Sequence, residues 1–122
     1  MRTPSGDAWI LAADEAALRA PAGPPAAARL LPAGDAYFLL QGIDRELLVP
    51  DAPRRAALWT TRVWPGALLV KGEVAGTWRR AREVVTIETW GGLSRAAVAA
   101  VEAEAASLPL PIEEPIHVRW SH

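Results

Sequence analysis

The sequence predicts an α+β domain in which a small antiparallel, partly closed, barrel-like sheet carries a C-terminal helix packed on it. Two apolar runs flank Lys71–Gly72, and glycine readily takes the positive φ that a tight hairpin needs. The next run, Val84–Trp90, is dominated by β-branched residues, which favour strands. Ser94 then offers an N-cap for a helix that reaches about Leu108. Together these signals predict a three-stranded meander over Ala67–Trp90, followed by a helix.

Composition and charge limit the class of protein. With 122 residues the chain has the usual size of one domain. Its 13 basic and 14 acidic side chains give a formal net charge of −1, so any DNA contact must come from a local patch rather than from overall charge. There is no cysteine, which excludes disulfides and thiolate chemistry, and no apolar run long enough for a membrane span. We interpret the protein as soluble and cytoplasmic, with no membrane partner.

The first 28 residues are expected to form a segment of their own. The apolar run Asp7–Ala12 predicts a short strand, and Asp14 offers an N-cap to an alanine-rich helix. Three prolines and a glycine among small residues make Pro21–Arg29 an extended connector. We therefore separate an N-terminal strand, short helix and connector at residues 1–28 from a C-terminal α+β module at residues 29–122.

The region between the connector and the meander is expected to combine strands with one helix. Closely spaced apolar residues over Leu30–Val49 predict buried strands joined by turns. Asp51 predicts the start of a short helix at Pro53–Trp59, because aspartate caps free N–H groups and proline fits the first turn. The tail Ile116–His122 follows several prolines and is expected either to add an edge strand or to remain loose.

The C-terminal helix is expected to be amphipathic, with an apolar stripe at helical spacing and a charged outer face. The apolar stripe comprises Leu93, Ala97, Val101, Ala105 and Leu108. The outer face comprises Arg95, Glu102 and Glu104.

No set of residues in the sequence has the composition of an active site. The two histidines, His117 and His122, lie in the last six residues, where a catalytic base would be poorly held. Carboxylate pairs such as Glu113 and Glu114 are spaced to diverge and have no histidine near them for a metal site. The common nucleotide-binding and zinc motifs are absent. We expect no catalysis by the chain alone, no metal and no cofactor.

One basic cluster, at Gly76–Arg82, has a functional interpretation. Arginines at a strand end beside a tryptophan can straddle a phosphate backbone while the indole stacks or packs beneath them. A lysine at the hairpin tip adds charge, and two arginines on the helix after Asp51 form a weaker second patch. The alternative is an ordinary exposed strand whose tryptophan serves the core. The candidate DNA-backbone contacts are Lys71, Trp78, Arg79, Arg80, Arg82, Arg54 and Arg55.

A second polar cluster has a structural interpretation. An Asp-Arg neighbour pair beside apolar segments can hydrogen-bond the backbone of a turn and hold the arginine in place. Buried polar side chains more commonly satisfy loop backbone than bind substrates. The members of this cluster are Asp35, Tyr37, Asp44 and Arg45.

Three segments of the chain resemble a known protein family. They are RLLPAGDAYFLLQGIDRELLVPD at Arg29–Asp51, WPGALLVKGEVAGTWRR at Trp64–Arg80, and a closing helix that contains VEAEAASL. Together they cover roughly Arg29–Leu108, and the pattern V-x-G-x-V-x-G-T-W-R within them is specific. In these segments the chain resembles the winged-helix DNA-binding proteins related to bacterial DNA glycosylases that unhook interstrand crosslinks.

This resemblance implies a role in DNA binding and DNA repair. In the family the matching region lies at the C-terminus, as a small barrel-like module beside tandem winged helices that line a basic DNA-binding cleft. The family's catalytic glutamine pair belongs to the N-terminal part, and Gln41, the only glutamine here, cannot supply such a pair. The resemblance therefore implies a non-catalytic accessory module that contacts the DNA backbone without sequence specificity, while a full-length relative is a candidate glycosylase.

A second interpretation belongs to a different class, a protein–protein docking or self-association module with no DNA contact of its own. The nearly neutral charge favours it, and an apolar docking face would be exposed if the rest of a full-length relative were absent. Its partners would be winged-helix domains, in cis or on another chain, or a second copy in a homo-oligomer. An enzyme acting alone is a third interpretation, against which the lack of acid–base residues argues.

Overall fold

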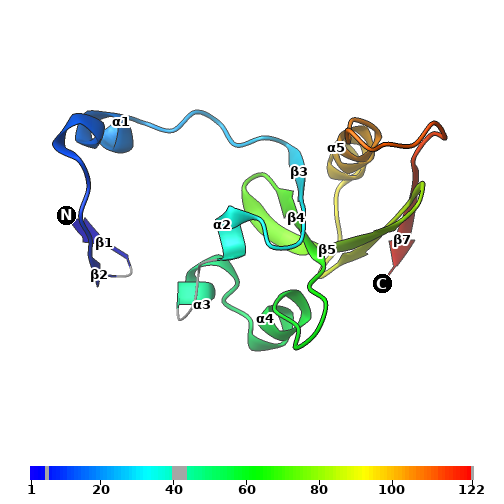
Figure 1. Ribbon diagram of the computed structural model, residues 1–122, viewed down its shortest axis with the longest axis horizontal. Coiled ribbons are helices and arrows are strands. Elements are labelled where there is room, and N and C mark those ends of the chain that lie inside the picture. The colour runs from blue at the N-terminus through cyan, green and yellow to red at the C-terminus, as the bar shows by residue number, and fades with distance from the viewer. Residues whose placement is uncertain (5, 40–43, 122) are drawn as a thin grey trace.

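The computed structural model of the chain describes residues 1–4, 6–39 and 44–121. A five-stranded sheet forms its centre, and the segment that precedes this sheet extends away from it as an arm (Figure 1). The strands are β1 Arg2–Thr3, β2 Gly6–Asp7, β3 Ala28–Leu31, β4 Gly66–Val70, β5 Glu73–Ala81, β6 Val84–Thr89 and β7 His117–Ser121. The helices are η1 Ala12–Asp14, α1 Glu15–Arg19, α2 Ala36–Leu39, α3 Arg45–Leu48, α4 Ala52–Leu58 and α5 Arg95–Ala106. No helix within these described ranges is long and apolar enough to cross a membrane.

The central sheet is mixed and open. Its strand order is β3-β4-β5-β6-β7, with β3 to β6 antiparallel and β7 parallel to β6. The expected α+β class is confirmed, but the expected barrel-like closure is wrong, because β3 and β7 lie at opposite edges and do not pair. The connection through α5 carries the chain back along the sheet, so that β7 pairs with β6 in parallel at one edge and β3 remains at the other edge.

The strand meander forms as the sequence predicts. In the turn between β4 and β5, Lys71 has φ 51° and Gly72 has φ 83°, the left-handed pair that a two-residue hairpin uses. The turn between β5 and β6 is equally short, since Ala81 pairs with Val84, and Arg82 adopts φ 55° within it. Both hairpins therefore form, although only the first is signalled by a glycine.

Two helices begin at the residues that the sequence predicts. The Asp51 carboxylate accepts a hydrogen bond from the Arg54 backbone N–H at 3.1 Å and caps α4. The Ser94 hydroxyl oxygen accepts one from the Ala97 N–H at 3.1 Å and caps α5. On α5, however, Glu104 does not belong to the outer face: its carboxylate accepts a hydrogen bond from the Arg29 guanidinium at 3.2 Å, beside β3.

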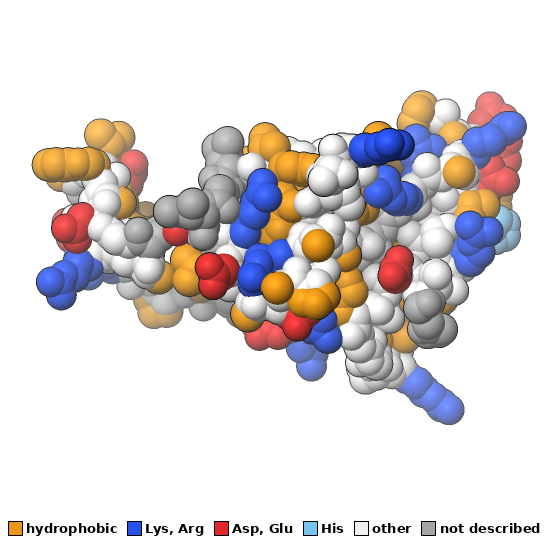
Figure 2. Space-filling model, turned by 90° about the horizontal axis from the view of Figure 1, so that it is seen from below, with side chains coloured by type: hydrophobic (Ala, Val, Ile, Leu, Met, Phe, Trp, Pro, Cys, Tyr) orange, Lys and Arg blue, Asp and Glu red, His pale blue; other side chains and the backbone are white. Residues whose placement is uncertain are grey.

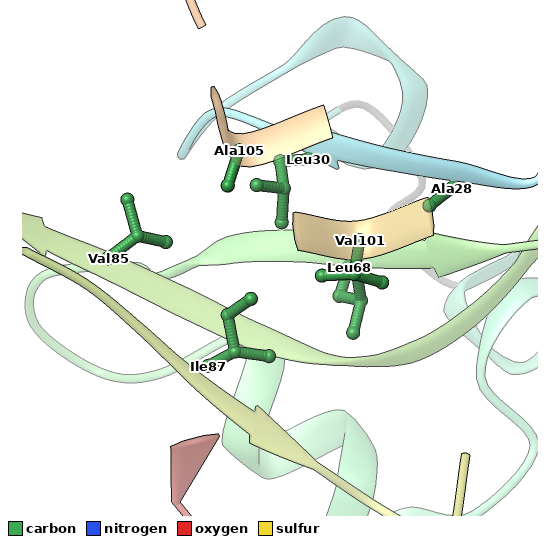
Figure 3. Close-up of a cluster of buried hydrophobic side chains, with 7 residues drawn as sticks. All are labelled: Ala28, Leu30, Leu68, Val85, Ile87, Val101 and Ala105. Carbon is green, nitrogen blue, oxygen red and sulfur yellow. The ribbon is translucent and has the colours of Figure 1, made fainter. Parts of the chain in front are cut away.

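Two apolar clusters lie on opposite faces of the sheet, because successive residues of a strand point to opposite sides. The α5 cluster, between the sheet and α5, comprises Ala28, Leu30, Leu68, Val85, Ile87, Val101 and Ala105, which meet in the close-up of Figure 3. The short-helix cluster, between the sheet and α2 to α4, comprises Phe38, Val49, Leu58, Trp59, Ala67 and Leu69. The two clusters place α5 on one side of the sheet and the short helices on the other.

Two expectations about strands are wrong. Most of Asp7–Ala12 is not a strand: β2 ends at Asp7, and Trp9 and Leu11 beyond it are exposed, so they gain no burial from an extended pairing. Within Leu30–Val49 the strand β3 ends at Leu31, and the two further elements that the structure describes, α2 and α3, are helices rather than strands. Short apolar runs fit a buried strand and a buried helical turn equally well, and here Phe38 of α2 packs against Trp59, which directly follows α4.

Candidate nucleic-acid interface

The predicted basic residues do not form one patch. Lys71 lies at one end of β5, in the turn from β4, and Arg82 lies at the other end, in the turn to β6. A nine-residue strand such as β5 is roughly 30 Å long at about 3.3 Å per residue. On the face drawn in Figure 2, Lys and Arg side chains are interspersed with Asp and Glu. Lys71 is therefore separate from the arginines at the far end of β5.

The arginines at the far end of β5 are themselves divided between the two faces of the sheet. Arg79 pairs with Thr86, and its guanidinium donates to the Val63 carbonyl at 2.8 Å. Arg80 pairs with Val85, whose side chain belongs to the α5 cluster, so Arg80 points to the α5 face of the sheet, opposite to Arg79. The side chain of Arg82, in the turn itself, is 84% exposed. The three arginines thus surround the end of the β5–β6 hairpin instead of covering one surface.

Trp78 packs against the core between these arginines. Its indole N–H donates to the Leu31 carbonyl at 2.8 Å, and its ring packs against the α5 cluster. The ring lies directly over Gly66 on the neighbouring strand, where a Cβ would overlap with it. This placement fixes the indole within the sheet.

The two arginines of α4 are occupied with the protein's own backbone. Arg54 donates to the Trp90 carbonyl at 2.8 Å, and its guanidinium lies 5.8 Å from the centre of the Trp90 ring. Arg55 donates to the carbonyls of Val49, at 3.0 Å, and Pro50. Both side chains therefore join α4 to neighbouring segments.

The second polar cluster lies around the short helices. The Asp35 carboxylate accepts a hydrogen bond from the Tyr37 backbone N–H at 2.9 Å at the start of α2. Asp44 occupies the N-cap position of α3 without a side-chain cap bond. The Arg45 guanidinium lies 4.8 Å from the Trp59 ring centre, while its buried Nε has no hydrogen-bond partner in the described part of the chain.

A polar hollow on the sheet face opposite α5 contains residues that sequence reasoning did not single out. The hollow has a volume of about 410 Å³. Strand register places six of its lining side chains in two adjacent rows across β5, β6 and β7. One row is Arg79, Thr86 and Arg119, and the next is Thr77, Glu88 and Ser121. The alternation of polar and apolar residues in β7 is the signal that would have placed Arg119 on this face.

A second hollow, on the α5 side of the sheet, is lined mainly by apolar side chains. This hollow of about 510 Å³, beside the start of α5, is lined by Trp90, Leu93 and Trp120 and has no titratable side chain in its wall. Across the residues that the structure describes, no three His, Asp or Glu side chains gather to hold a metal ion. His117 is exposed on β7, while His122 and Gln41 lie outside the described residues.

Comparison with known proteins places this fold in a family. A family model described as DNA glycosylase AlkZ-like matches residues 2–109, whereas no curated protein gives a significant match. Among solved structures, Streptomyces sahachiroi DNA glycosylase AlkZ is similar in fold, with a TM-score of 0.68 and 24% sequence identity. That similarity covers 92% of this chain and 30% of the AlkZ chain. The resemblance inferred from sequence is thereby confirmed, and because the family model spans most of the sequence, this chain belongs to the DNA glycosylase AlkZ-like family.

Proposed function

We propose that this chain is an accessory DNA-binding module of an AlkZ-like protein, which contacts the DNA backbone without reading its sequence and without performing the glycosylase chemistry. The observation that supports this most is the end of the β5–β6 hairpin, where Arg79, Arg80 and Arg82 lie within four residues. Guanidinium groups bind phosphate oxygens through paired N–H donors and stay charged at any physiological pH.

The shape of the hairpin end suits contact with a backbone. Arg79 and Arg80 point to opposite faces of the sheet and Arg82 occupies the turn, so positive charge surrounds the tip. Trp78 supports this end from within the sheet rather than stacking on a base. Lys71 and the α4 pair, Arg54 and Arg55, are weaker contacts in this proposal, because they lie away from the hairpin end where the three arginines gather.

Composition supports contact without sequence reading. The chain has no asparagine and one glutamine, so the paired amide contacts that recognise adenine are almost unavailable to it. Arginine contacts to phosphate carry affinity and little sequence information. We therefore expect binding that depends strongly on salt and weakly on duplex sequence.

We expect the triple variant Arg79→Ala/Arg80→Ala/Arg82→Ala to bind duplex DNA more weakly than the unmodified chain. In a fluorescence anisotropy titration with a labelled duplex across a salt series, the plot of log affinity against log salt should become less steep by roughly two to three units, because each lost phosphate contact removes about 0.9.

The matched control removes the same charge elsewhere. Arg2, Arg19 and Arg95 are exposed and lie away from the hairpin end, so their triple alanine variant should keep the unmodified salt dependence. Equal losses in the two triple variants would mean that only net charge matters, and the hairpin end would then not be the binding surface. A folded chain that binds no duplex at low salt would rule out DNA binding by this module on its own.

A second candidate function, docking on another protein chain, is favoured by the N-terminal arm. Trp9 is fully exposed at 103%, and Leu11 and Leu18 are also largely exposed. Exposed apolar side chains gathered on one arm are typical of a surface that another chain covers. In this proposal the arm docks on a winged-helix region of an AlkZ-like protein or on a second copy of the chain.

Sedimentation velocity over a range of concentrations tests the docking proposal. The unmodified chain should self-associate as concentration rises, because burial of the arm removes apolar surface from water. The variant Trp9→Ser/Leu11→Ser/Leu18→Ser should stay monomeric, whereas Val63→Ser, at an exposed apolar residue outside the arm, should associate like the unmodified chain. A chain that remains monomeric at every concentration, even without these substitutions, would contradict self-docking through the arm.

A further inference from the structure

The polar hollow opposite α5 has the composition of a ligand site. Its two rows run across three paired strands, and the two arginines of the first row, Arg79 and Arg119, stand on either side of Thr86. Neighbouring strands lie about 4.8 Å apart, so the Cα atoms of these arginines are roughly 10 Å apart, a separation from which both guanidinium groups can reach one phosphate. The hollow's volume of about 410 Å³ is in the range of small-ligand pockets.

Several polar groups around this hollow are available to a ligand. Thr77 is only 8% exposed and lines the hollow, yet its hydroxyl has no hydrogen bond to any described residue. The same holds, within the described ranges, for the side chains of Glu88 and Arg119. Arg79 donates one of its five N–H groups to Val63 and keeps the others available. Arg79, Glu88 and Arg119 are exposed on one face of the sheet, so a ligand in the hollow can engage all three side chains without breaking up the core.

The charges of the two rows specify the chemistry of that ligand. Within the two rows, two arginines and one carboxylate leave a single net positive charge, which matches one phosphodiester group. Arg80 also lines the hollow, but its guanidinium donates to the Arg82 carbonyl at 2.8 Å. Glu88 lies in the row next to the arginines, where it repels a second phosphate and accepts hydrogen bonds from N–H donors. A nucleotide unit with an amino group on its base offers both features, the phosphate for the first row and the amino group for the second.

We propose that this sheet face binds one nucleotide of an unpaired DNA strand, with the phosphate between Arg79 and Arg119 and an amino group of the base at Glu88. An open three-strand face accommodates a splayed single strand, whose base edges are free, more readily than the closed grooves of a duplex. This site would recognise a base, which the backbone contact proposed above does not do. It rests on that proposal only in taking DNA as the ligand.

Anisotropy titrations of the full chain with two labelled twelve-nucleotide strands, all cytosine and all thymine, test the site. The two bases have similar size and stacking, but cytosine carries an amino group where thymine carries a carbonyl oxygen. The unmodified chain should bind the cytosine strand roughly tenfold more tightly, the lower end of what one hydrogen bond to a charged acceptor contributes. Glu88→Gln should bring the two affinities within about twofold, because an amide can pair with either base.

The substitution Arg119→Ala should weaken binding to the cytosine and thymine strands equally, by roughly tenfold. It should also reduce the slope of log affinity against log salt by about 0.7, the value for one phosphate contact on a single strand. The control is Arg95→Ala, which removes the same charge at the start of α5, on the opposite face of the sheet. Both residues are exposed, so neither change should affect folding.

Three outcomes would overturn this inference while leaving the backbone-contact proposal intact. They are equal affinity of the unmodified chain for the cytosine and thymine strands, an Arg119→Ala variant that binds like Arg95→Ala, and duplex binding that depends on Arg119 as strongly as single-strand binding does. A preference for cytosine that is lost in Glu88→Gln would support the sheet-face site. If duplex binding were at the same time unchanged in the Arg79/Arg80/Arg82 triple variant, the hairpin proposal would be contradicted.

Discussion

Replacing Gly76 with alanine is expected to lower the free energy of unfolding by more than about 3 kcal/mol, a large part of the stability of a domain of this size. Gly76 lies on β5 opposite Thr89 of β6. A Cβ at Gly76 would overlap with the carbonyl oxygen of Glu88 and would lie 3.1 Å from the Thr89 Cα. Both obstacles are backbone atoms, so the clash can be relieved only by moving β6 away from β5 and breaking the ladder between them.

Denaturant unfolding followed by circular dichroism measures this effect. Gly91→Ala is the matched control, because nothing lies within 4 Å of a Cβ at Gly91 and its φ is not positive. We expect that control to stay within about 0.5 kcal/mol of the unmodified chain. If Gly76→Ala proved as mild as Gly91→Ala, the close approach of β5 and β6 at this point would be wrong, and with it the row that pairs Thr77 with Glu88.

Replacing Phe38 with alanine is expected to lower the free energy of unfolding by about 3–5 kcal/mol, the usual cost of removing a buried aromatic ring. Phe38 is 0% exposed at the centre of the short-helix cluster. Its ring centre lies 6.3 Å from those of Trp59, in an edge-to-face arrangement, and Trp64, in a stacked one. The cavity left by the ring would remove both aromatic contacts at once.

The control for Phe38→Ala is Leu47→Ala on α3, where the leucine is 56% exposed and truncation should cost about 0.5 kcal/mol or less. Tryptophan fluorescence during denaturation reports on the same cluster, because Trp59 and Trp64 both contact the Phe38 ring. A midpoint for Phe38→Ala equal to that of Leu47→Ala would show that the Phe38 ring does not pack against Trp59 and Trp64.

Elements whose signals are local are the ones that the sequence predicts well. Asp51 and Ser94 cap the helices that follow them because the capping hydrogen bond joins residues three apart. Glycine at Gly72 permits the hairpin turn whatever the rest of the chain does. Family membership was likewise readable from sequence, because its motif V-x-G-x-V-x-G-T-W-R is continuous over β4 and β5.

The candidate site was predictable only in part. Arg79, Arg80 and Arg82 are adjacent in sequence and were identified as one cluster, yet the two-residue period of a strand places Arg79 and Arg80 on opposite faces. The sequence alone does not associate Arg119 with Arg79, because the two lie about forty residues apart and only the pairing of β7 with β6 brings Arg119 into the same row.

By itself, then, the sequence determined the α+β class, the family, the meander and the starts of α4 and α5. Tertiary structure alone decided that Leu30–Val49 contains α2 and α3, that the sheet stays open, and that β7 runs parallel to β6. The physical reason is the range of the interactions concerned. Caps and turns depend on neighbours within a few residues, whereas strand pairing and burial depend on partners that are distant in sequence, and several arrangements satisfy the same local pattern.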